Sequence, residues 1–204
     1  SDVAKKKGIN SIPKFFSRDN LDKASKFLKK TDIIFGANVV CHIPDLIEFI
    51  KTADALLNDN GKIIFEEPYL GSMYKKTSYD QIYDEHIFIF SATSISKIFE
   101  LFDFELIDAI KQPTHGGSMR YVLQRKSSNK KNKKIRSILE EEKRNGVSSL
   151  KGALKFKKNC EKSKEILLDK LKKIKKSGHL ICGYGATSKS TTILNYCGIG
   201  PETI

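Results

Sequence analysis

Along the first 125 residues, strand-like and helix-like patterns of hydrophobic and polar positions alternate. Continuous apolar runs at TDIIFGANVV (residues 31–40) and GKIIFEE (residues 61–67) are typical of strands buried on both faces of a parallel sheet. Apolar residues recur at helical spacing in DNLDKASKFLKK (residues 19–30) and from about Asp45 to Leu57. Helix and strand therefore alternate, which predicts βαβ units with right-handed crossovers and a parallel sheet.

The sheet is expected to end in an antiparallel pair of strands. A short helix is predicted from about Ser94 to Leu101, and FELIDAIKQ (residues 104–112) and SMRYVLQRK (residues 118–126) each have the pattern of a strand. The glycine-containing stretch PTHGGS (residues 113–118) joins them, so we expect a hairpin.

Beyond residue 125 the pattern becomes helical and lysine-rich, and then returns to α/β. A partial helical stripe breaks near Asn145-Gly146 and stops at Ser177-Gly178. The stretch after it predicts a strand at 179–182, a glycine turn at 183–185 and a helix from about 187 to 196. A lone strand and helix cannot bury a core, so we expect both ends of the sequence to be cuts in a longer protein. The predicted division is a core at 1–125, a helical linker at 126–176 and the beginning of a second α/β domain at 177–204.

The net charge of +13 suggests a nucleic-acid partner, but its distribution argues against one. Residues 126–176 contain 19 Lys/Arg and six Asp/Glu, so this segment carries the whole excess. Arginine is scarce there, and there is no pattern of interleaved aromatic residues for base stacking. We interpret the lysines as a solvated helix face and expect no nucleic acid.

Composition disfavours two further classes of protein. No run of about 18 apolar residues occurs, so we expect no transmembrane helix and no membrane partner. Cys41, Cys160, Cys182 and Cys197 form no CxxC pair, which indicates reduced thiols in a cytoplasmic protein. The sequence therefore predicts no disulfide and no metal site within this chain.

The densest group of proton-transfer side chains is Tyr83-Asp84-Glu85-His86. Alone, this group could be an exposed polar loop. Two further polar groups, His42 and the pair Glu66-Glu67, follow the two predicted parallel strands. Open α/β sheets bind ligands at the carboxyl ends of their strands, so these groups are expected to converge. Their convergence predicts an active site at this edge of the sheet.

Two glycine-containing motifs offer places for an anion. PTHGGSMR (residues 113–120) combines a histidine, flexible glycines and an arginine that can hold a phosphate with two hydrogen bonds. GYGATSKS (residues 183–190) places glycines, hydroxyls and Lys189 at a predicted helix N-terminus, where N–H groups favour a phosphate. Each motif also has a plain structural interpretation, namely a hairpin turn and a tight strand–helix turn.

Taken together, the motifs resemble a known family. NVVCHIPD, IIFEEPYL, DQIYDEHIFIFS, THGGSMRY and GYGATSKSTTILNYCGIGP resemble, in order and spacing, S-adenosylmethionine-dependent sugar C-methyltransferases acting on dTDP-linked 4-keto deoxysugars. The resemblance spans nearly the whole chain apart from the lysine-rich linker. It implies an α/β fold: a partial Rossmann-like class I methyltransferase core, a helical linker and the start of a second α/β domain. It also implies an N-terminal zinc-binding module and a glycine-rich cofactor loop, both expected before Ser1.

The resemblance further implies roles for individual residues. His86 is expected to be the general base that removes a proton next to a ketone, flanked by Tyr83, Glu85 and His42. Contacts with S-adenosylmethionine are expected from Phe16, Ala37 and Asn38. The residues expected to bind a nucleotide-sugar substrate are Glu67, His115, Gly116, Gly117, Ser118, Arg120, Gly183, Tyr184, Gly185 and Lys189. A monomer is expected.

Three other functions stay open. The first is a methyltransferase of the same fold that acts on a hydroxyl, an amine or a small carbonyl acid, which product analysis would separate. The second is a nicotinamide-dependent oxidoreductase, because GYGA resembles a dinucleotide-binding loop; it predicts binding of NAD. The third is a non-catalytic basic module using residues 126–176, which predicts strongly salt-dependent binding to nucleic acid.

Overall fold

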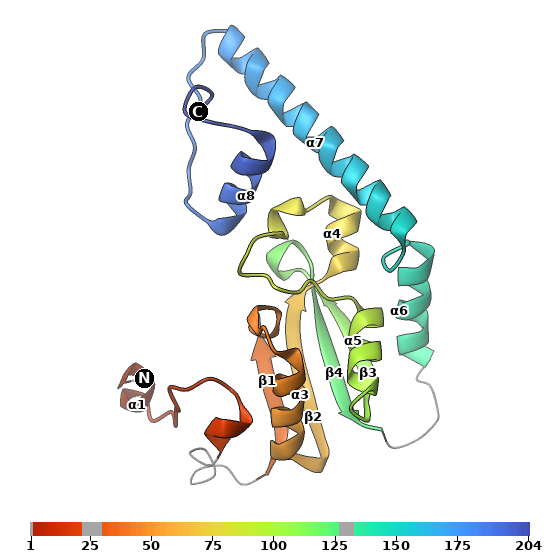
Figure 1. The fold of residues 1–204 in the computed structure, drawn as a ribbon. Coiled ribbons are helices and arrows are strands. Elements are labelled where there is room, and N and C mark those ends of the chain that lie inside the picture. The colour runs from red at the N-terminus through yellow and green to blue at the C-terminus, as the bar shows by residue number, and fades with distance from the viewer. Residues whose placement is uncertain (1, 22–29, 127–132) are drawn as a thin grey trace.

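A four-stranded sheet lies at the centre of the computed structural model, which describes residues 2–21, 30–126 and 133–204 (Figure 1). Its strands are β1 (Thr31–Ala37), β2 (Leu57–Pro68), β3 (Phe104–Gln112) and β4 (Ser118–Arg125). In the order β1-β2-β4-β3, β1 and β2 are parallel and β4 is antiparallel to both of its neighbours. The α/β fold, the parallel pair and the hairpin predicted from the sequence are therefore confirmed.

Helices α3, α5 and α6 pack against this sheet. The α-helices are α1 (Asp2–Lys6), α3 (Leu46–Leu56), α4 (Leu70–Lys76), α5 (Ala92–Glu100), α6 (Lys133–Arg144), α7 (Leu150–Lys176) and α8 (Ser188–Cys197), and the 3-10 helices are η1 (Arg18–Asn20), η2 (Val40–His42), η3 (Tyr79–Gln81) and η4 (Thr114–Gly116). Most of the helix predicted at 19–30 lies outside the described residues. Figure 1 shows α4 beyond the upper end of the sheet and α7 extending away from it, with α8 beside α7. Within the described ranges, no helix has both the length and the apolar character needed to cross a membrane.

Side-chain caps determine where several helices begin. The side chain of Asp45 accepts a hydrogen bond at the start of α3. Ser91 and Ser94 cap the start of α5 reciprocally, and Thr187 and Ser190 do the same for α8. Such caps satisfy backbone N–H groups that the first helical turn leaves unpaired. These helix starts therefore follow from the local sequence.

Aromatic packing around Phe65 of β2 forms the middle of the core. Its ring centroid lies 5.3 Å from that of Tyr121, 5.8 Å from that of Phe99 and 6.3 Å from that of Phe90. All four side chains are almost completely buried. Burial of each such ring stabilises the fold by roughly 2–3 kcal/mol, so this cluster holds β2, β4 and α5 together.

A buried carboxylate ties α6 to this core. Glu142 is 1% exposed and accepts hydrogen bonds from the backbone N–H groups of Ala92 (2.7 Å) and Thr93 (2.8 Å). Those groups belong to the first turn of α5, where a negative charge is favourable. Ile135 of α6 also joins the hydrophobic core. The first helix of the lysine-rich segment is thus packed on the sheet domain, while the predicted division into three parts stays a prediction.

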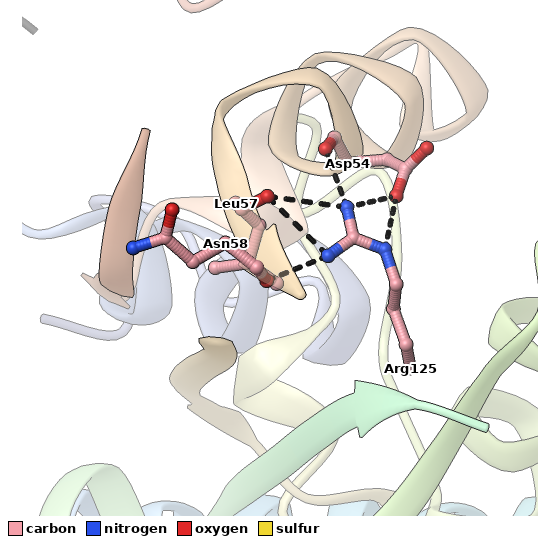
Figure 2. A network of polar contacts seen from close by, with 4 residues as sticks. All are labelled: Asp54, Leu57, Asn58 and Arg125. Carbon is pink, nitrogen blue, oxygen red and sulfur yellow. Dashed lines mark hydrogen bonds and ion pairs between the residues drawn. The ribbon is translucent and has the colours of Figure 1, made fainter. Parts of the chain in front are cut away.

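A second polar network lies at the end of the sheet where β2 begins and β4 ends (Figure 2). The guanidinium of Arg125, the last residue of β4, donates to the carboxylate of Asp54 and to the backbone carbonyls of Asp54, Leu57 and Asn58. It also lies 5.7 Å from the ring centroid of Phe104. Arg125 therefore joins the end of β4 to the end of α3 and the start of β2.

Two predicted strands differ in the structure. β1 ends at Ala37 and is not buried on both faces, because Ile33 is 57% exposed and Phe35 is 64% exposed. It is an edge strand, and among the described residues β2 is its sole partner. Residues 179–182 form no strand, and Leu180 is 90% exposed. A strand needs neighbouring strands to pair its N–H and C=O groups. Within the described residues β1 has such a neighbour on one edge alone, and residues 179–182 have none.

Candidate active site

Polar side chains from two strand ends and one loop meet at the carboxyl edge of β1 and β2. β1 leads through η2 to His42, and β2 ends in Glu66 and Glu67. The loop after η3 brings His86 to within 5.1 Å of His42, measured between ring centroids. The convergence expected from the sequence is therefore present, and it lies where open α/β sheets bind ligands.

Backbone carbonyls hold both imidazoles in one tautomer. Nδ1 of His42 lies 2.6 Å from the carbonyl oxygen of Glu85, and Nδ1 of His86 lies 2.9 Å from that of Gln81. Because a carbonyl can only accept, each Nδ1 carries the proton, and each Nε2 of a neutral ring has a free lone pair. The hydroxyl of Tyr83 donates to Nε2 of His86 at 2.8 Å.

The surroundings of this pair keep the imidazole neutral and the phenol protonated. Burial lowers the pKa of His86 below its ordinary value, and the charges of His42 and Lys189 add to this effect, whereas the carbonyl of Gln81 opposes it. Burial raises the pKa of Tyr83, with a further contribution from Cys41. The arrangement thus offers a basic nitrogen and a hydroxyl donor side by side.

Glu67 lies beneath the histidines and does not reach the surface. Its carboxylate is 0% exposed, and one oxygen accepts from the backbone N–H groups of Val39 (3.0 Å) and Val40 (2.7 Å). These bonds hold η2, which carries His42. Burial, followed by the Glu67 carboxylate, raises the pKa of the Cys41 thiol well above its ordinary value. In this conformation Glu67 supports the site from below, and its predicted contact with a substrate stays a prediction.

The HGGS loop is joined to the site through its backbone. The carbonyl of His115 accepts from the Gln81 side chain at 2.8 Å, and the carbonyl of Gly116 accepts from Lys76 at 2.6 Å. Gly117 has a φ of +128°, and a Cβ there would lie 2.6 Å from Ser72. Gly117 is therefore required both by its backbone conformation and by its close neighbour. Ser118 is buried beside it, and its hydroxyl donates to a backbone carbonyl at 3.2 Å.

The guanidinium of Arg120 is already paired with a carboxylate of this chain. It is the cross-strand neighbour of Glu66 in the β2–β4 register, and its guanidinium lies 3.0 Å from the Glu66 carboxylate. The other carboxylate oxygen of Glu66 accepts from Thr114 at 2.9 Å. An anion binding to Arg120 would therefore compete with this ion pair.

Helix α8 packs against the loop that carries His86 and brings Lys189 of the GYGATSKS motif near that histidine. Thr192 donates to the carbonyl of Ile82 at 3.2 Å, and Tyr196 packs on Tyr79 with 4.9 Å between ring centroids. Lys189 is close enough to affect His86 electrostatically. By contrast, Gly183, Tyr184 and Gly185 are exposed to solvent.

An open cleft of about 620 Å³ lies between this helix and the loop that carries the catalytic candidates. Tyr83 and Asp84 line one side, and hydroxyl residues of the α8 N-terminus, including Thr187 and Ser188, line the other. The cleft therefore brings residues about 100 positions apart in the sequence to one space.

The residues expected to contact a cofactor come from two segments. Phe16 is 39% exposed, and its ring lies 5.6 Å from that of Phe49 in the first turn of α3. Ala37 is exposed at the end of β1, and Asn38 follows it with a φ of +52°. Asn38 donates its backbone N–H to the carbonyl of Glu66 at 2.8 Å, which ties the residue after β1 to β2.

Sequence reasoning missed two residues of the site. Gln81, which is 4% exposed, links His86 to the HGGS loop through its carbonyl and its side-chain amide. Gln81 stands two residues before Tyr83 in the sequence, and this proximity could have identified it as a member of the site. Cys41 was interpreted as an ordinary buried thiol, yet its sulfur and one ring nitrogen each of His42 and His86 all lie within 4.8 Å of one another.

Comparisons with known families divide the chain into two matches. The family described as a methyltransferase domain matches residues 3–109. The family described as a C-methyltransferase C-terminal domain matches residues 113–204. The candidate residues His42, Tyr83 and His86 lie in the first match, and the HGGS and GYGA motifs lie in the second.

One similar protein is the C-methyltransferase NovU of Streptomyces niveus, which is 26% identical over 203 residues. The alignment covers 99% of this chain and 48% of NovU, so the chain spans about half the length of that relative.

Solved structures also match. One is the magnesium protoporphyrin IX methyltransferase ChlM of Synechocystis PCC 6803 with bound SAH, at 16% identity and a TM-score of 0.37, covering 50% of this chain and 48% of ChlM. Another is LaPhzM, at 13% identity and a TM-score of 0.41, covering 61% of this chain and 38% of LaPhzM. Matches this weak carry no argument, so the family assignment rests on the sequence comparisons.

Proposed function

Because the chain belongs to the S-adenosylmethionine-dependent C-methyltransferase family, we propose that the enzyme carrying it methylates a carbon next to the ketone of a nucleotide-linked keto-deoxysugar. In this proposal His86 is the general base. Carbon methylation requires a nucleophilic carbon, and removing a proton from the position next to a ketone generates one as an enolate.

The observation that carries this proposal is the fixed state of the two imidazoles. Nδ1 of His86 is bonded to a carbonyl, so Nε2 faces the site as the basic atom. A general base must have a lone pair aimed at the proton it removes, and the bond at Nδ1 leaves that lone pair on Nε2, where it accepts from Tyr83 until a substrate takes the place of the hydroxyl. Tyr83, whose hydroxyl lies 2.8 Å from that nitrogen, can turn from Nε2 to the substrate oxygen as the proton is transferred.

The enolate oxygen needs hydrogen-bond donors, because negative charge develops there. Tyr83 is one such donor, and His42 is a second when its Nε2 is protonated. Glu85 contributes its carbonyl, which holds His42, while its own carboxylate is exposed to solvent. Lys189 is the nearest identified cation, and we assign it to the diphosphate of the substrate together with the GYGA and HGGS loops.

Phe16 and the residues at the end of β1 fit S-adenosylmethionine in kind. An exposed phenyl ring at Phe16 can stack on an adenine, and the Asn38 side chain offers both a donor and an acceptor. When bound, this cofactor supplies an electrophilic methyl group. The chain's own task is then to hold the acceptor carbon, remove its proton to His86 and keep water from the enolate.

The test is exchange of substrate protons with solvent deuterium, measured by mass spectrometry on a dTDP-linked 4-keto-6-deoxysugar with the full-length enzyme. The wild-type enzyme should exchange the position next to the ketone. His86→Asn should slow this exchange roughly 100-fold or more, because a positioned base contributes on that order. Sugar-nucleotide binding should stay close to normal.

His179→Asn is the matched control. That ring pairs with Ser177, two residues away, and is absent from the site described above, so exchange should be unchanged. Full exchange in His86→Asn would refute the assignment of the base. A product methylated on oxygen or nitrogen would refute the proposed reaction.

A further inference from the structure

The cluster of Cys41, His42 and His86 has the composition of a metal site. Each residue offers one ligand atom, and the three atoms all lie within 4.8 Å of one another. A thiolate and two imidazoles form the kind of nitrogen and sulfur set that Zn²⁺ prefers. The sequence pattern hid this set, because Cys41 and His42 are adjacent and His86 comes from a distant loop.

Both imidazoles are already oriented as metal-bound histidines usually are. Such a histidine donates its second N–H to a carbonyl or carboxylate, which fixes the tautomer and the direction of the ring. Here the carbonyls of Glu85 and Gln81 accept from the Nδ1 atoms of His42 and His86. The Nε2 atoms are therefore the ligand atoms, and the outer support of a metal site is in place without the metal.

A buried carboxylate adds an independent indication. Glu67 is 0% exposed, and its Oε2 has no hydrogen-bond partner among the described residues. Together with the Cys41 thiolate, this carboxylate would balance the charge of a divalent cation. Glu67 is not one of the three residues whose ligand atoms lie together, but its charge acts on Cys41, so a cation held there would offset part of the cost of burying this carboxylate.

We propose that Cys41, His42 and His86 bind one Zn²⁺ reversibly and that the bound metal inhibits proton removal by His86. Cys41 releases its thiol proton to solvent on binding, and Tyr83 gives up its hydrogen bond to Nε2 of His86. Tetrahedral bonds of about 2.0–2.3 Å set donor atoms roughly 3.5 Å apart, so the side chains close by on the order of 1 Å. Only the inhibitory consequence rests on the proposed function; the metal site itself does not.

Cobalt is the probe for the binding step, because tetrahedral Co²⁺ with a thiolate ligand absorbs in the visible and near ultraviolet. Titration of this chain with Co²⁺ should give a tetrahedral spectrum and a thiolate charge-transfer band that saturate at one equivalent, and Zn²⁺ should displace both. Cys41→Ser should remove the charge-transfer band. His42→Gln, a change outside the core, should weaken binding at least tenfold, which keeps the test valid if the Cys41 variant does not fold.

Cys182→Ser and His179→Gln are the matched controls, because Cys182 is exposed and neither residue belongs to the cluster. Neither should change the spectrum. The proposal is overturned if no thiolate band forms, or if the band survives Cys41→Ser, or if His42→Gln binds as tightly as the wild type.

Inhibition is tested separately, on deuterium exchange by the full-length enzyme. Added Zn²⁺ should suppress exchange and a chelator should restore it, and Cys41→Ser should need at least tenfold more Zn²⁺ for half suppression of its own metal-free rate. Unchanged exchange with the cobalt site filled would overturn the inhibitory role and leave the metal site standing. Absence of exchange under all conditions would count against the proposed function instead.

Discussion

At the scale of single residues, backbone carbonyl oxygens hold the two imidazoles in place, whereas the sequence had drawn attention to carboxylates. The sequence brought Glu85 and His86 to attention as charged and basic side chains. In the structure, Glu85 and Gln81 hold the two imidazoles through their backbone, and Glu67 is buried under the loop. A backbone contact leaves no trace in residue types, so the sequence brought His42, Tyr83 and His86 to attention as candidates but could not predict how the two imidazoles are held or that Gln81 takes part.

Arg125 provides a test of stability at this scale. Arg125→Met keeps the apolar stem but removes the hydrogen bonds to Asp54, Leu57 and Asn58. We expect the free energy of unfolding to fall by about 1–2 kcal/mol, a modest loss because the arginine side chain is 28% exposed. Urea denaturation should show a lower midpoint with an unchanged slope.

The matched control is Arg136→Met on the outer side of α6, where the arginine is exposed. Its unfolding free energy should stay within about 0.5 kcal/mol of the wild type. Equal effects of the two substitutions would mean that the network at Arg125 contributes nothing beyond a surface charge.

At the scale of elements, local pattern predicted those helices and strands that find a partner within the chain. β3 and β4 lie where the alternation placed them, and α3 and α5 start within about two residues of expectation. The failures share one cause. Residues 179–182 and the outer side of β1 are apolar and strand-like, but burial and pairing depend on neighbours that the local pattern does not specify.

The contact between α6 and α5 gives an element-scale prediction. Glu142→Ala leaves the buried N–H group of Ala92 and the partly buried N–H group of Thr93 without their acceptor. We expect a loss of about 2–4 kcal/mol in the free energy of unfolding, since each unsatisfied buried donor costs about 1–3 kcal/mol. Thermal or urea unfolding measures it.

Glu140→Ala serves as the comparison, because Glu140 is exposed on the same helix. Its effect should be a few tenths of a kcal/mol. If Glu142→Ala lowered the free energy of unfolding by as little, then water would be pairing with the N–H groups at the start of α5. In that case Glu142 would not anchor α6 there.

At the scale of the whole molecule, helix α8 folds back on the loop that carries Tyr83 and His86. Tyr196 and Cys197 contact Tyr79, and Thr192 contacts Ile82, directly before Tyr83. The sequence predicted helix α8 but gave no sign of where it docks, because such a contact depends on the path of α7 between them. The shape of the cleft at Tyr83 therefore depends on residues near the C-terminal end.

Tyr196→Ala tests this docking. Loss of the ring contact with Tyr79 should weaken the hold on the loop by about 1 kcal/mol, as expected for one aromatic pair. Hydrogen exchange of the backbone amides at residues 79–86 should then be roughly fivefold faster. Mass spectrometry of the corresponding peptides measures this.

Tyr184→Ala removes a tyrosine that is fully exposed, and it should leave the same amides unchanged. Unaltered exchange at residues 79–86 in Tyr196→Ala would indicate that the loop is held by its own contacts and that α8 is a bystander.

The strand order β1-β2-β4-β3 also has a consequence for how the protein is made. Of the four strands described, β4 leaves the ribosome last, yet it sits between β2 and β3 and pairs with both. Until residues 118–125 emerge, one edge of β2 stays open, and Phe65 lacks its partner Tyr121. Open apolar edges are where nascent chains stick to one another. These four strands are therefore exposed to such contacts until the hairpin closes, and a single step, the arrival of β4, completes their pairing.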